Sequence, residues 1–441
     1  MCKISYAVDK HRELILSAER YIWKNPETGY REVKTSKYME EIFEKLGYEL
    51  VRAEGIPGFY TVLDTGREGP EVLILGELDC IICPSHKDAD PITGAVHACG
   101  HNAQCAALIG VAAALKEPNM LDGLCGRIRL CAVPAEELLE IEYRKQLQSQ
   151  GKIKYLGGKS EFLHRGFFDG VDMAFMVHTS GGYFCNEGCV GCVAKNVIYK
   201  GTAAHAGGEP WAGNNALYAA TCGLNAANSL RETFKDSDLI RFHPIITRGG
   251  DMVNAIPERV QLESYVRGRS YDSIVKNNEK INRALIGGAL SIGTNIEIID
   301  MPGYAPLKND ENMISVASEG AKMVGIDLKV SSGYLSGSTD MGDLSTIMPV
   351  VHPWSGGAIG TAHGSDYEIA DPEAACVTTA KWQVAMLTIL LENGAERAKK
   401  IIKEFKPMFA SKEEFLAFQD NLNTFGDRIT YREDGRAEIK L

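Results

Sequence analysis

The sequence predicts an α/β protein in which a smaller domain interrupts a larger one. Between residues 72 and 177, short apolar runs alternate with helical stretches, which is the pattern of a parallel or mixed sheet flanked by helices. From about residue 192 to residue 300 the order changes to strand, helix, strand, strand, helix, strand, which describes a ferredoxin-like module. The length of 441 residues agrees with two domains, because it exceeds what one ordinary core holds.

The larger domain begins with two amphipathic helices, over about 10–24 and 33–46, and Gly47 is a suitable residue to end the second. Its next expected elements are strands over 72–75, 128–133 and 173–177 and a helix over 102–115. We therefore expect a central, mostly parallel sheet that is flanked by helices.

The inserted domain has its own set of expected elements: strands over 194–200, 240–247, 259–267 and 295–300, and helices over 214–232 and 271–290. Pro302, Gly303 and Pro306 mark its end, and a helix over 311–324 resumes the α/β pattern. The expected domains are 1–192 with 303–441, and the insertion 193–302. The basic, glycine-containing stretch 143–159 is expected to be a surface loop.

The composition indicates which class of partner and which cellular location to expect. The net charge of −11 argues against a nucleic acid or an anionic membrane as a partner, so a small-molecule substrate is favoured. The first residues lack the apolar core of a signal peptide, and no run of 18 apolar residues occurs. The 12 cysteines are scattered, most of them in apolar stretches, as in a reducing compartment. We expect a cytoplasmic protein.

Acidic and imidazole side chains follow three of the expected strands. Glu77 and Asp79 follow the first, Glu136 and Glu137 follow the second, and His178 follows the third. Because functional groups gather at the carboxyl ends of strands in open α/β sheets, we expect these side chains to meet at one rim.

Cys99 and His101 stand directly before the helix expected at residue 102, and Gly100 between them permits a tight turn. Thiolate, imidazole and carboxylate groups all bind Zn²⁺ and similar ions. The spacing alone leaves open that Cys99 is a core thiol and that His97 and His101 cap the helix.

The adjacent acids Glu136 and Glu137 favour a metal site more strongly. Two neighbouring carboxylates repel each other unless a cation neutralises them. One could ligate a metal while the other accepts a proton from a metal-bound water. A solvated acidic turn is the alternative.

Six motifs carry a resemblance to a known family. They are HACGHN (97–102), PAEE (134–137), MVH (176–178), AAHA (203–206), NAIPE (254–258) and GSTDMGD (337–343). The chain resembles the amidohydrolase branch of the aminoacylase and carboxypeptidase-G metallopeptidase family. That branch includes hippurate hydrolase, auxin-conjugate hydrolases and one of the two subunits of p-aminobenzoyl-glutamate hydrolase. The likeness extends from residue 25 to residue 363.

The resemblance implies a role for each matching residue. Two divalent metal ions, zinc or manganese, would be held by Cys99, His101, Glu137, His178 and His363. Glu136 would be the general base, and Asp79 would orient a ligand. His205 would stabilise the oxyanion from the inserted lid domain, often across the interface of a homodimer. Asn254 and Arg267 match positions suited to a substrate carboxylate.

The implied activity is hydrolysis of an amide bond by a metal-activated water. The substrate would be an N-acyl amino acid, an aryl amide of glutamate or a dipeptide. Asn102 and Gln104 replace the Asp and His of the hippurate and auxin-conjugate members, so the chain looks closer to the p-aminobenzoyl-glutamate and dipeptidase-like members. The stretch 138–162 is longer than expected and could reshape one wall of the pocket, and His352 is expected to be a structural histidine.

Two rival functions belong to other classes. An inactive, small-molecule-binding relative would be expected to lack Glu136 or a metal ligand, and here the set is complete. A thiol oxidoreductase using Cys189 and Cys192 would need an exposed cysteine of low pKa. These cysteines stand in a glycine-rich, strand-like stretch without a following helix, which favours a structural interpretation.

Overall fold

The computed structural model describes residues 3–441, and their contacts form two compact units. Unit 1 comprises the chain up to Gly188 together with Leu307–Leu335 and Thr339–Lys412. Unit 2 comprises Cys189–Pro306, Ser336–Ser338 and Glu413–Leu441.

Unit 1 begins with three helices, α1 (Lys3–Asp9), α2 (Arg12–Trp23) and α3 (Val33–Lys45). The last two confirm the helices predicted from the amphipathic pattern. In α2 the residues at helical spacing, Ile15, Ala18 and Ile22, are fully buried and form its inner face.

The main sheet of unit 1 is mostly parallel, as predicted. Its order is β1-β2-β6-β3-β7-β19, in which β6, β3, β7 and β19 run parallel and β2 is antiparallel to β6. The strands are β1 (Val51–Arg52), β2 (Phe59–Asp64), β3 (Glu71–Glu77), β6 (Arg127–Val133), β7 (Met173–Phe175) and β19 (Val350–Val351). Every residue of β3 is buried, as in a strand covered on both faces.

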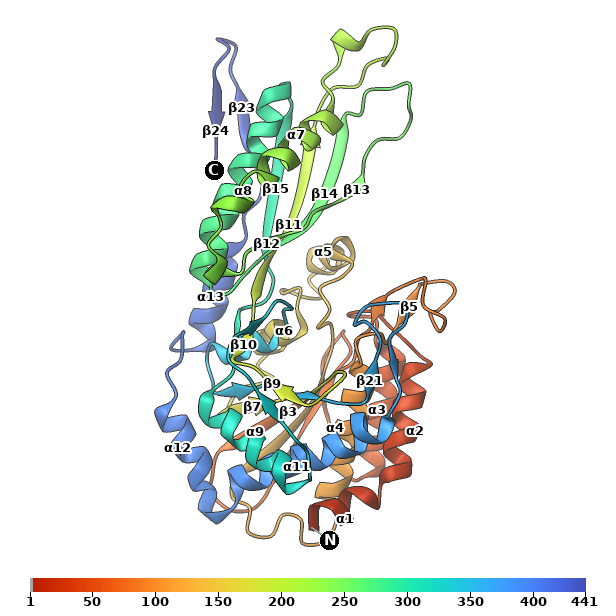
Figure 1. Ribbon diagram of the computed structural model, residues 1–441, viewed down its shortest axis with the longest axis vertical. Coiled ribbons are helices and arrows are strands. Elements are labelled where there is room, and N and C mark those ends of the chain that lie inside the picture. Colours follow the sequence, from red (N-terminus) through yellow and green to blue (C-terminus); the bar gives the residue numbers. More distant parts are fainter. Residues whose placement is uncertain (1–2) are drawn as a thin grey trace. The chain divides into compact units, whose positions relative to one another are not determined.

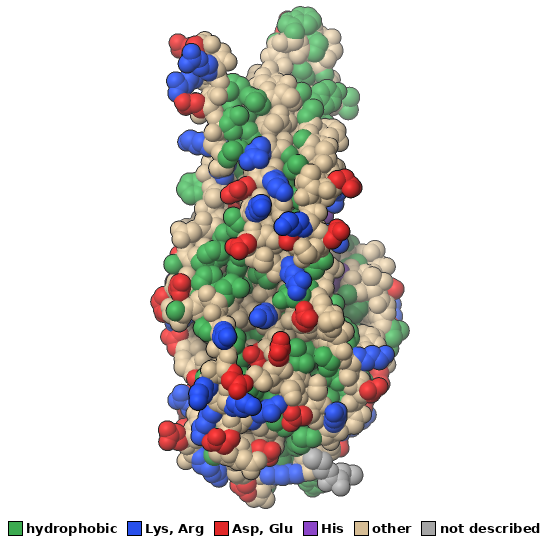
Figure 2. All heavy atoms as spheres, turned by 60° about the vertical axis from the view of Figure 1, so that its left-hand side comes forward, with side chains coloured by type: hydrophobic (Ala, Val, Ile, Leu, Met, Phe, Trp, Pro, Cys, Tyr) green, Lys and Arg blue, Asp and Glu red, His purple; other side chains and the backbone are tan. Residues whose placement is uncertain are grey.

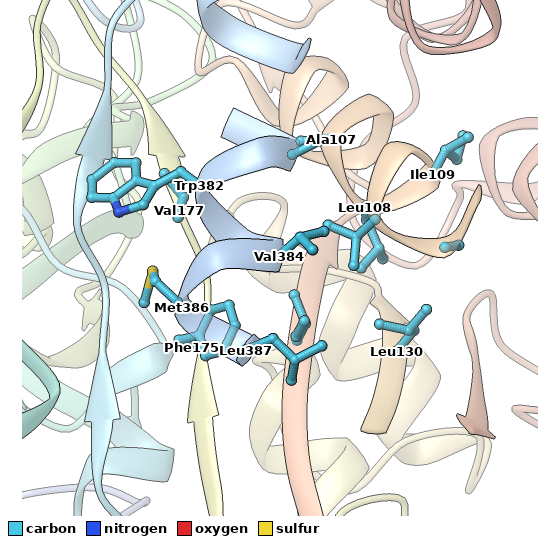
Figure 3. Packing of buried hydrophobic residues seen from close by; sticks show 14 of the residues in the cluster. Ala107, Leu108, Ile109, Leu130, Phe175, Val177, Trp382, Val384, Met386 and Leu387 are labelled. Carbon is cyan, nitrogen blue, oxygen red and sulfur yellow. The ribbon is translucent and has the colours of Figure 1, made fainter. Parts of the chain in front are cut away.

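Helix α4 (His101–Leu115) packs against β3 and lies beside α2 and α11 (Thr379–Leu391). All of its residues are buried. Figure 3 shows Leu108 of α4 gathered with Val384 and Leu387 of α11 and Phe175 of β7 in one hydrophobic cluster. The span Glu373–Leu391, which includes α11, is long and apolar enough to cross a membrane, but 72 % of that window is buried inside the protein, as in a core helix.

Smaller elements complete unit 1. The helices are α5 (Ile141–Ser149), α6 (Gly158–His164), α9 (Glu311–Met323), α10 (Met341–Ser345), η4 (Glu373–Thr378), η5 (Asn393–Ala395) and α12 (Glu396–Glu404). The short strands are β4 (Ile81–Ile82), β5 (Ala95–Val96), β8 (His178–Thr179), β9 (Phe184–Cys185), β10 (Gly188–Cys189), β16 (Leu307–Lys308), β17 (Lys329–Val330), β18 (Tyr334–Leu335), β20 (Trp354–Ser355), β21 (Ala358–Ile359) and β22 (Glu368–Ile369).

The stretch 143–159 is not the surface loop that its basic composition suggested. It forms α5 and the start of α6, and Arg144 and Lys159 are almost completely buried. The prediction failed because both cations are held by buried acceptors, an arrangement that a composition pattern does not reveal. Other residues of the stretch, among them Gln148 and Lys152, line a hollow of about 470 Å³.

Unit 2 contains the predicted β-α-β-β-α-β order. Its antiparallel sheet has the order β12-β14-β11-β15, with β13 also paired to β14, and α7 and α8 pack together against it (Figure 1). The elements are β11 (Gly191–Lys200), η1 (Pro210–Ala212), α7 (Ala216–Asn228), η2 (Arg231–Thr233), η3 (Asp236–Asp238), β12 (Arg241–Phe242), β13 (Ile245–Arg248), β14 (Arg259–Gly268), α8 (Tyr271–Ile292) and β15 (Asn295–Pro302). The single strand expected over 240–247 is divided at Pro244, which has no N–H for the ladder.

The C-terminal segment groups with unit 2, whereas the sequence pattern placed all of 303–441 in the larger domain. It consists of α13 (Lys412–Leu422) and a hairpin of β23 (Ile429–Tyr431) and β24 (Ala437–Ile439). Asp300 and Thr424 exchange two backbone hydrogen bonds, and Tyr431 Oη donates to the carbonyl of Thr294. These bonds attach the segment to the β15 side of the sheet.

Candidate metal centre

The carboxyl ends of three neighbouring strands of unit 1 carry the acids and the imidazole that the sequence placed there. Glu77 ends β3 and Asp79 follows it. Glu136 and Glu137 follow β6, and His178 stands in β8, directly after β7. Because β6, β3 and β7 are adjacent and parallel, these side chains reach the same rim of the sheet.

The turn before α4 presents Cys99 and His101. Gly100 has a φ of 88°, and a Cβ at this position would lie 2.5 Å from Tyr367 Oη, so only glycine fits. His101 is the first residue of α4 and is completely buried. The side chains on both sides of Gly100 are therefore held in one orientation.

Asp79 orients His101. His101 Nδ1 lies 3.0 Å from the carbonyl oxygen of Asp79 and 3.2 Å from its Oδ1, so Nδ1 donates and Nε2 is the atom left to bind a metal ion. Among the residues described, His101 Nε2 has no hydrogen-bond partner although it is buried. Asp79 Oδ2 also accepts from the backbone N–H of Glu137 at 2.7 Å. The Asp79 carboxylate, which follows β3, thus holds the residues that follow β6 in place through the N–H of Glu137.

Seven side chains provide three groups of possible metal ligands. Within each group the ligand atoms lie within 4.8 Å of one another. The groups are Cys99, His101 and His178; Cys99, Glu137 and His363; and Glu77, His101 and Glu136. The five predicted ligands all belong to the first two groups, and Cys99 belongs to both.

The first two groups have short internal distances. Cys99 Sγ lies 3.5 Å from His178 Nε2, whose ring is oriented by a contact of 2.9 Å between Nδ1 and the carbonyl of Thr179. His363 Nε2 lies 3.0 Å from Glu137 Oε1. A soft thiolate, nitrogen donors and one carboxylate form a set that suits zinc or a similar divalent ion.

The protein environment favours the ligand form of Cys99. Burial and the charge of Glu137 oppose ionisation of the thiol, but His101 and His178 outweigh them and lower its pKa to about 6. Hydrogen bonds to Cys99 and Glu137 raise the pKa of His363 to about 11. The pKa of His101 is also raised, so the centre stabilises a thiolate beside the imidazolium forms of His101 and His363, a charge distribution that a bound cation would replace.

The two adjacent glutamates differ in their protonation. Burial, together with the charges of Glu77 and Glu137, raises the pKa of Glu136 well above its ordinary value. For Glu137 the effect of burial is outweighed by His363, and the pKa falls to about 2. Such opposite shifts in neighbouring carboxyl groups are typical of sites with separate ligand and acid–base roles.

Lys159, Glu77 and Asp340 form a buried charge cluster that the sequence interpretation did not assign. Lys159 Nζ donates to Glu77 Oε1 at 2.6 Å and to Asp340. The available signals were the position of Glu77 at a strand end and the presence of Asp340 in the GSTDMGD motif. The sequence carries no such signal for Lys159, because the basic stretch around it predicts a surface loop.

The loop that carries Glu136 is held from behind by two further buried residues. Ala135 has a φ of 57°, an unusual value for a side chain with a Cβ, and its N–H donates to Glu32 Oε1 at 2.7 Å. The Arg144 guanidinium donates to the carbonyls of Leu156, at 2.7 Å, and Glu137. These contacts hold the strained loop in place.

His205, Asn254 and Arg267 belong to unit 2. His205 is exposed, and its Nδ1 accepts from the N–H groups of Gly207 and Gly208 at 3.2 and 2.8 Å, so the neutral ring carries its proton on Nε2. The carbonyl of Asn254 accepts from the N–H of Ala206, which brings Asn254 beside His205. Arg267 on β14 donates to Ser338 Oγ at 3.3 Å.

Other histidines and cysteines lie outside the three groups. His97 is buried, and burial and the neighbouring His101 lower its pKa to about 3. His352 is also buried and lies beside the rings of His178 and Trp354. Cys189 and Cys192 are buried, so they lack the exposure that thiol–disulfide exchange requires.

The fold and the site define a metal-dependent hydrolase of peptide or amide bonds, with its ligands at the carboxyl ends of a mostly parallel sheet. The model of peptidase family M20/M25/M40 matches residues 78–388, and the chain belongs to this family.

Named relatives agree with this assignment. Xaa-Arg dipeptidase of Mus musculus is 29 % identical over 423 residues, which cover 90 % of each chain. A p-aminobenzoyl-glutamate hydrolase subunit of Escherichia coli is 26 % identical over 67 % of this chain and 59 % of its own length. A dinuclear metal-binding peptidase of the M20 family from Bacillus subtilis has a similar fold, with a TM-score of 0.63 at 20 % identity, and covers 87 % of this chain and 99 % of its own.

Proposed function

We propose that this protein uses two divalent metal ions to hydrolyse the amide bond of a dipeptide or a related N-acyl amino acid. The observation that carries the proposal is the position of Cys99 in two ligand groups, with Glu136 buried beside them and belonging to neither. The first group is Cys99, His101 and His178, and the second is Cys99, Glu137 and His363.

The donor atoms fit such a pair of ions. His101 Nε2 has no hydrogen-bond partner among the described residues, and the low pKa of Cys99 provides a thiolate. When bound, zinc or manganese ions supply the positive charge that polarises an amide carbonyl and activates a water molecule.

The chain's own residues supply the proton transfer and the binding contacts. Glu136 accepts the proton of the attacking water and returns it to the leaving nitrogen. His205 donates through Nε2 to the oxyanion, since its Nδ1 is occupied as an acceptor. Asn254 and Arg267 hold the substrate carboxylate, for which a guanidinium is well shaped.

Dipeptides are the first substrate class to test. The similarity to Xaa-Arg dipeptidase covers nine-tenths of both chains, more than the similarity to the p-aminobenzoyl-glutamate hydrolase subunit. Asn102 and Gln104 favour the same choice, because they depart from the hippurate and auxin-conjugate members.

A homodimer and a cytoplasmic location complete the proposal. The exposed strand β13 supports a dimer, because its apolar residues offer a surface to a second copy. Most of the described cysteines are buried in the protein, as is usual for thiols in a reducing compartment, and cell fractionation would check the location.

Metal removal and restoration test the function. We expect the chelated and dialysed protein to be inactive and to recover activity with Zn²⁺ or Mn²⁺. The assay compares Xaa-Arg dipeptides, other dipeptides, p-aminobenzoyl-glutamate and N-acetyl amino acids at equal concentration. Full activity after chelation, with metal verified as absent, would disprove the metal-dependent mechanism. Turnover of N-acetyl amino acids alone would exclude the dipeptidase assignment.

A further inference from the structure

Lys159 is a buried cation beside the metal centre of unit 1, and the proposed mechanism does not use it. Its ammonium donates to Glu77 Oε1 at 2.6 Å and to Asp340 Oδ1, and its backbone N–H donates to Asp340 Oδ2 at 3.0 Å. All three side chains are 0 % exposed. A fully buried ammonium is stable only when such partners surround it, so Lys159 is a fixed component of the site.

Glu77 connects this cation to the third ligand group. While Oε1 is bound by Lys159, Oε2 lies 3.3 Å from His101 Nε2 and accepts no hydrogen bond from the described part of the chain. Glu77, His101 and Glu136 offer ligand atoms within 4.8 Å of one another, and all three are buried. Two carboxylates and an imidazole form an adequate set for a divalent ion.

Occupation of this third group would conflict with catalysis. A metal ion there would take Glu136 as a ligand, and a carboxylate bound in this way is a poor proton acceptor. His101 belongs to the first ligand group as well, so Glu77 and Glu136 would be the side chains that hold the additional ion. The chain therefore needs a feature that keeps a cation away from Glu77 and Glu136.

We propose that Lys159 is a positioning residue that keeps the third group free of metal. Its ammonium neutralises the Glu77 carboxylate and repels a further cation nearby, so that Glu136 is not captured as a ligand. Lys159 acts through Glu77 and does not touch the substrate. The inference rests on the proposed function, in which Glu136 is the base.

The metal content of variants tests this role. The protein, Lys159→Met and Lys159→Gln are equilibrated with Zn²⁺, dialysed and measured for zinc per chain by mass spectrometry. We expect two ions in the natural protein and one additional ion in both variants. Lys159→Gln keeps a hydrogen-bond donor for Glu77 without the charge, so it serves if Lys159→Met does not fold. Lys159→Arg, which retains the charge, should match the natural protein, and adding Glu77→Gln to either uncharged variant should abolish the additional ion.

Lys195→Met is the matched control. Lys195 is also 0 % exposed, and its ammonium donates to Asp300 and Asn282 within unit 2. This substitution removes an equally buried ion pair, and we expect no additional zinc. Unchanged zinc content in both uncharged Lys159 variants, or the same gain in Lys195→Met, would overturn the proposal. Absence of zinc from the natural protein would instead contradict the proposed function, so the two failures are distinguishable.

Discussion

Two buried cations, Lys159 and Arg144, support the candidate metal centre from outside its ligand groups. The position of Glu137 after an expected strand predicted its place at the rim of the sheet, whereas the ligand roles of Cys99 and His101 were implied by the family resemblance. Lys159 and Arg144 act through contacts with residues distant in sequence or with backbone carbonyls. Composition suggests that such cations are exposed, and only the three-dimensional packing shows the acceptors that bury them.

The contacts of Asn102 explain why an amide stands at this position. The sequence showed only that an Asp of related enzymes is replaced. In the structure Asn102 Nδ2 donates to Glu19 Oε1 at 2.8 Å, and both side chains are buried. Burial raises the pKa of Glu19. The Asn102 amide therefore supplies a hydrogen-bond donor to the buried carboxylate of Glu19, which belongs to α2.

Asn102→Asp should destabilise the protein by about 3 kcal/mol at pH 7, because it removes the donor and places two buried carboxylates together. Both would then have raised pKa values in the folded state, so the folded protein binds more protons than the unfolded one. The loss should shrink as the pH falls toward 5. Urea unfolding at pH 7 and pH 5 measures this.

The double variant Glu19→Gln with Asn102→Asp is the control, because it restores a donor and an acceptor in reversed order. It should recover most of the lost stability. A double variant as unstable as Asn102→Asp alone would show that the pair interaction is not the cause.

Among the elements, regular strands and helices followed from hydrophobic periodicity, whereas two features did not. Pro244 interrupts a strand that the apolar pattern predicted as continuous. The C-terminal hairpin has no apolar pattern that assigns it to either unit, and backbone bonds such as those between Asp300 and Thr424 attach it to unit 2. Hydrophobic periodicity predicts which residues of a segment are buried, but it does not predict which other segment they pack against.

Strand β13 is the element that supports a homodimer. All four of its residues are exposed, including Ile245 and Ile246, and its described pairing is with β14. Trp211 and Val253 are also exposed, and Figure 2 shows hydrophobic side chains on the surface of unit 2. An unpaired apolar edge of this kind is suited to pairing with a second copy.

We expect sedimentation velocity to give twice the chain mass of 48.1 kDa for the natural protein. The double variant Ile245→Lys with Ile246→Lys should shift it to the monomer, because two charges would be buried in the interface. Ile92→Lys, at an exposed position of unit 1, is the control and should remain dimeric. A monomeric natural protein at micromolar concentration, or a dimeric double variant, would refute a β13 interface.

At the scale of the whole molecule, the fold class was predictable because both units have a distinct order of elements. Alternation of apolar runs and helices describes the mostly parallel sheet of unit 1, and the β-α-β-β-α-β order describes unit 2. The residues that match the family model, 78–388, contain every predicted metal ligand and Glu136. The candidate site therefore lies within the part of the chain that shows the family membership.

The role of Glu136 as the general base is tested by the activity of Glu136→Gln, with the metal content determined in the same sample. Glutamine preserves the size of the side chain but cannot accept the proton. We expect kcat on the best dipeptide to fall by about 10²–10⁴-fold, while both metal ions and the thermal stability are retained. An unchanged kcat with both ions present would contradict the assignment of Glu136 as the base.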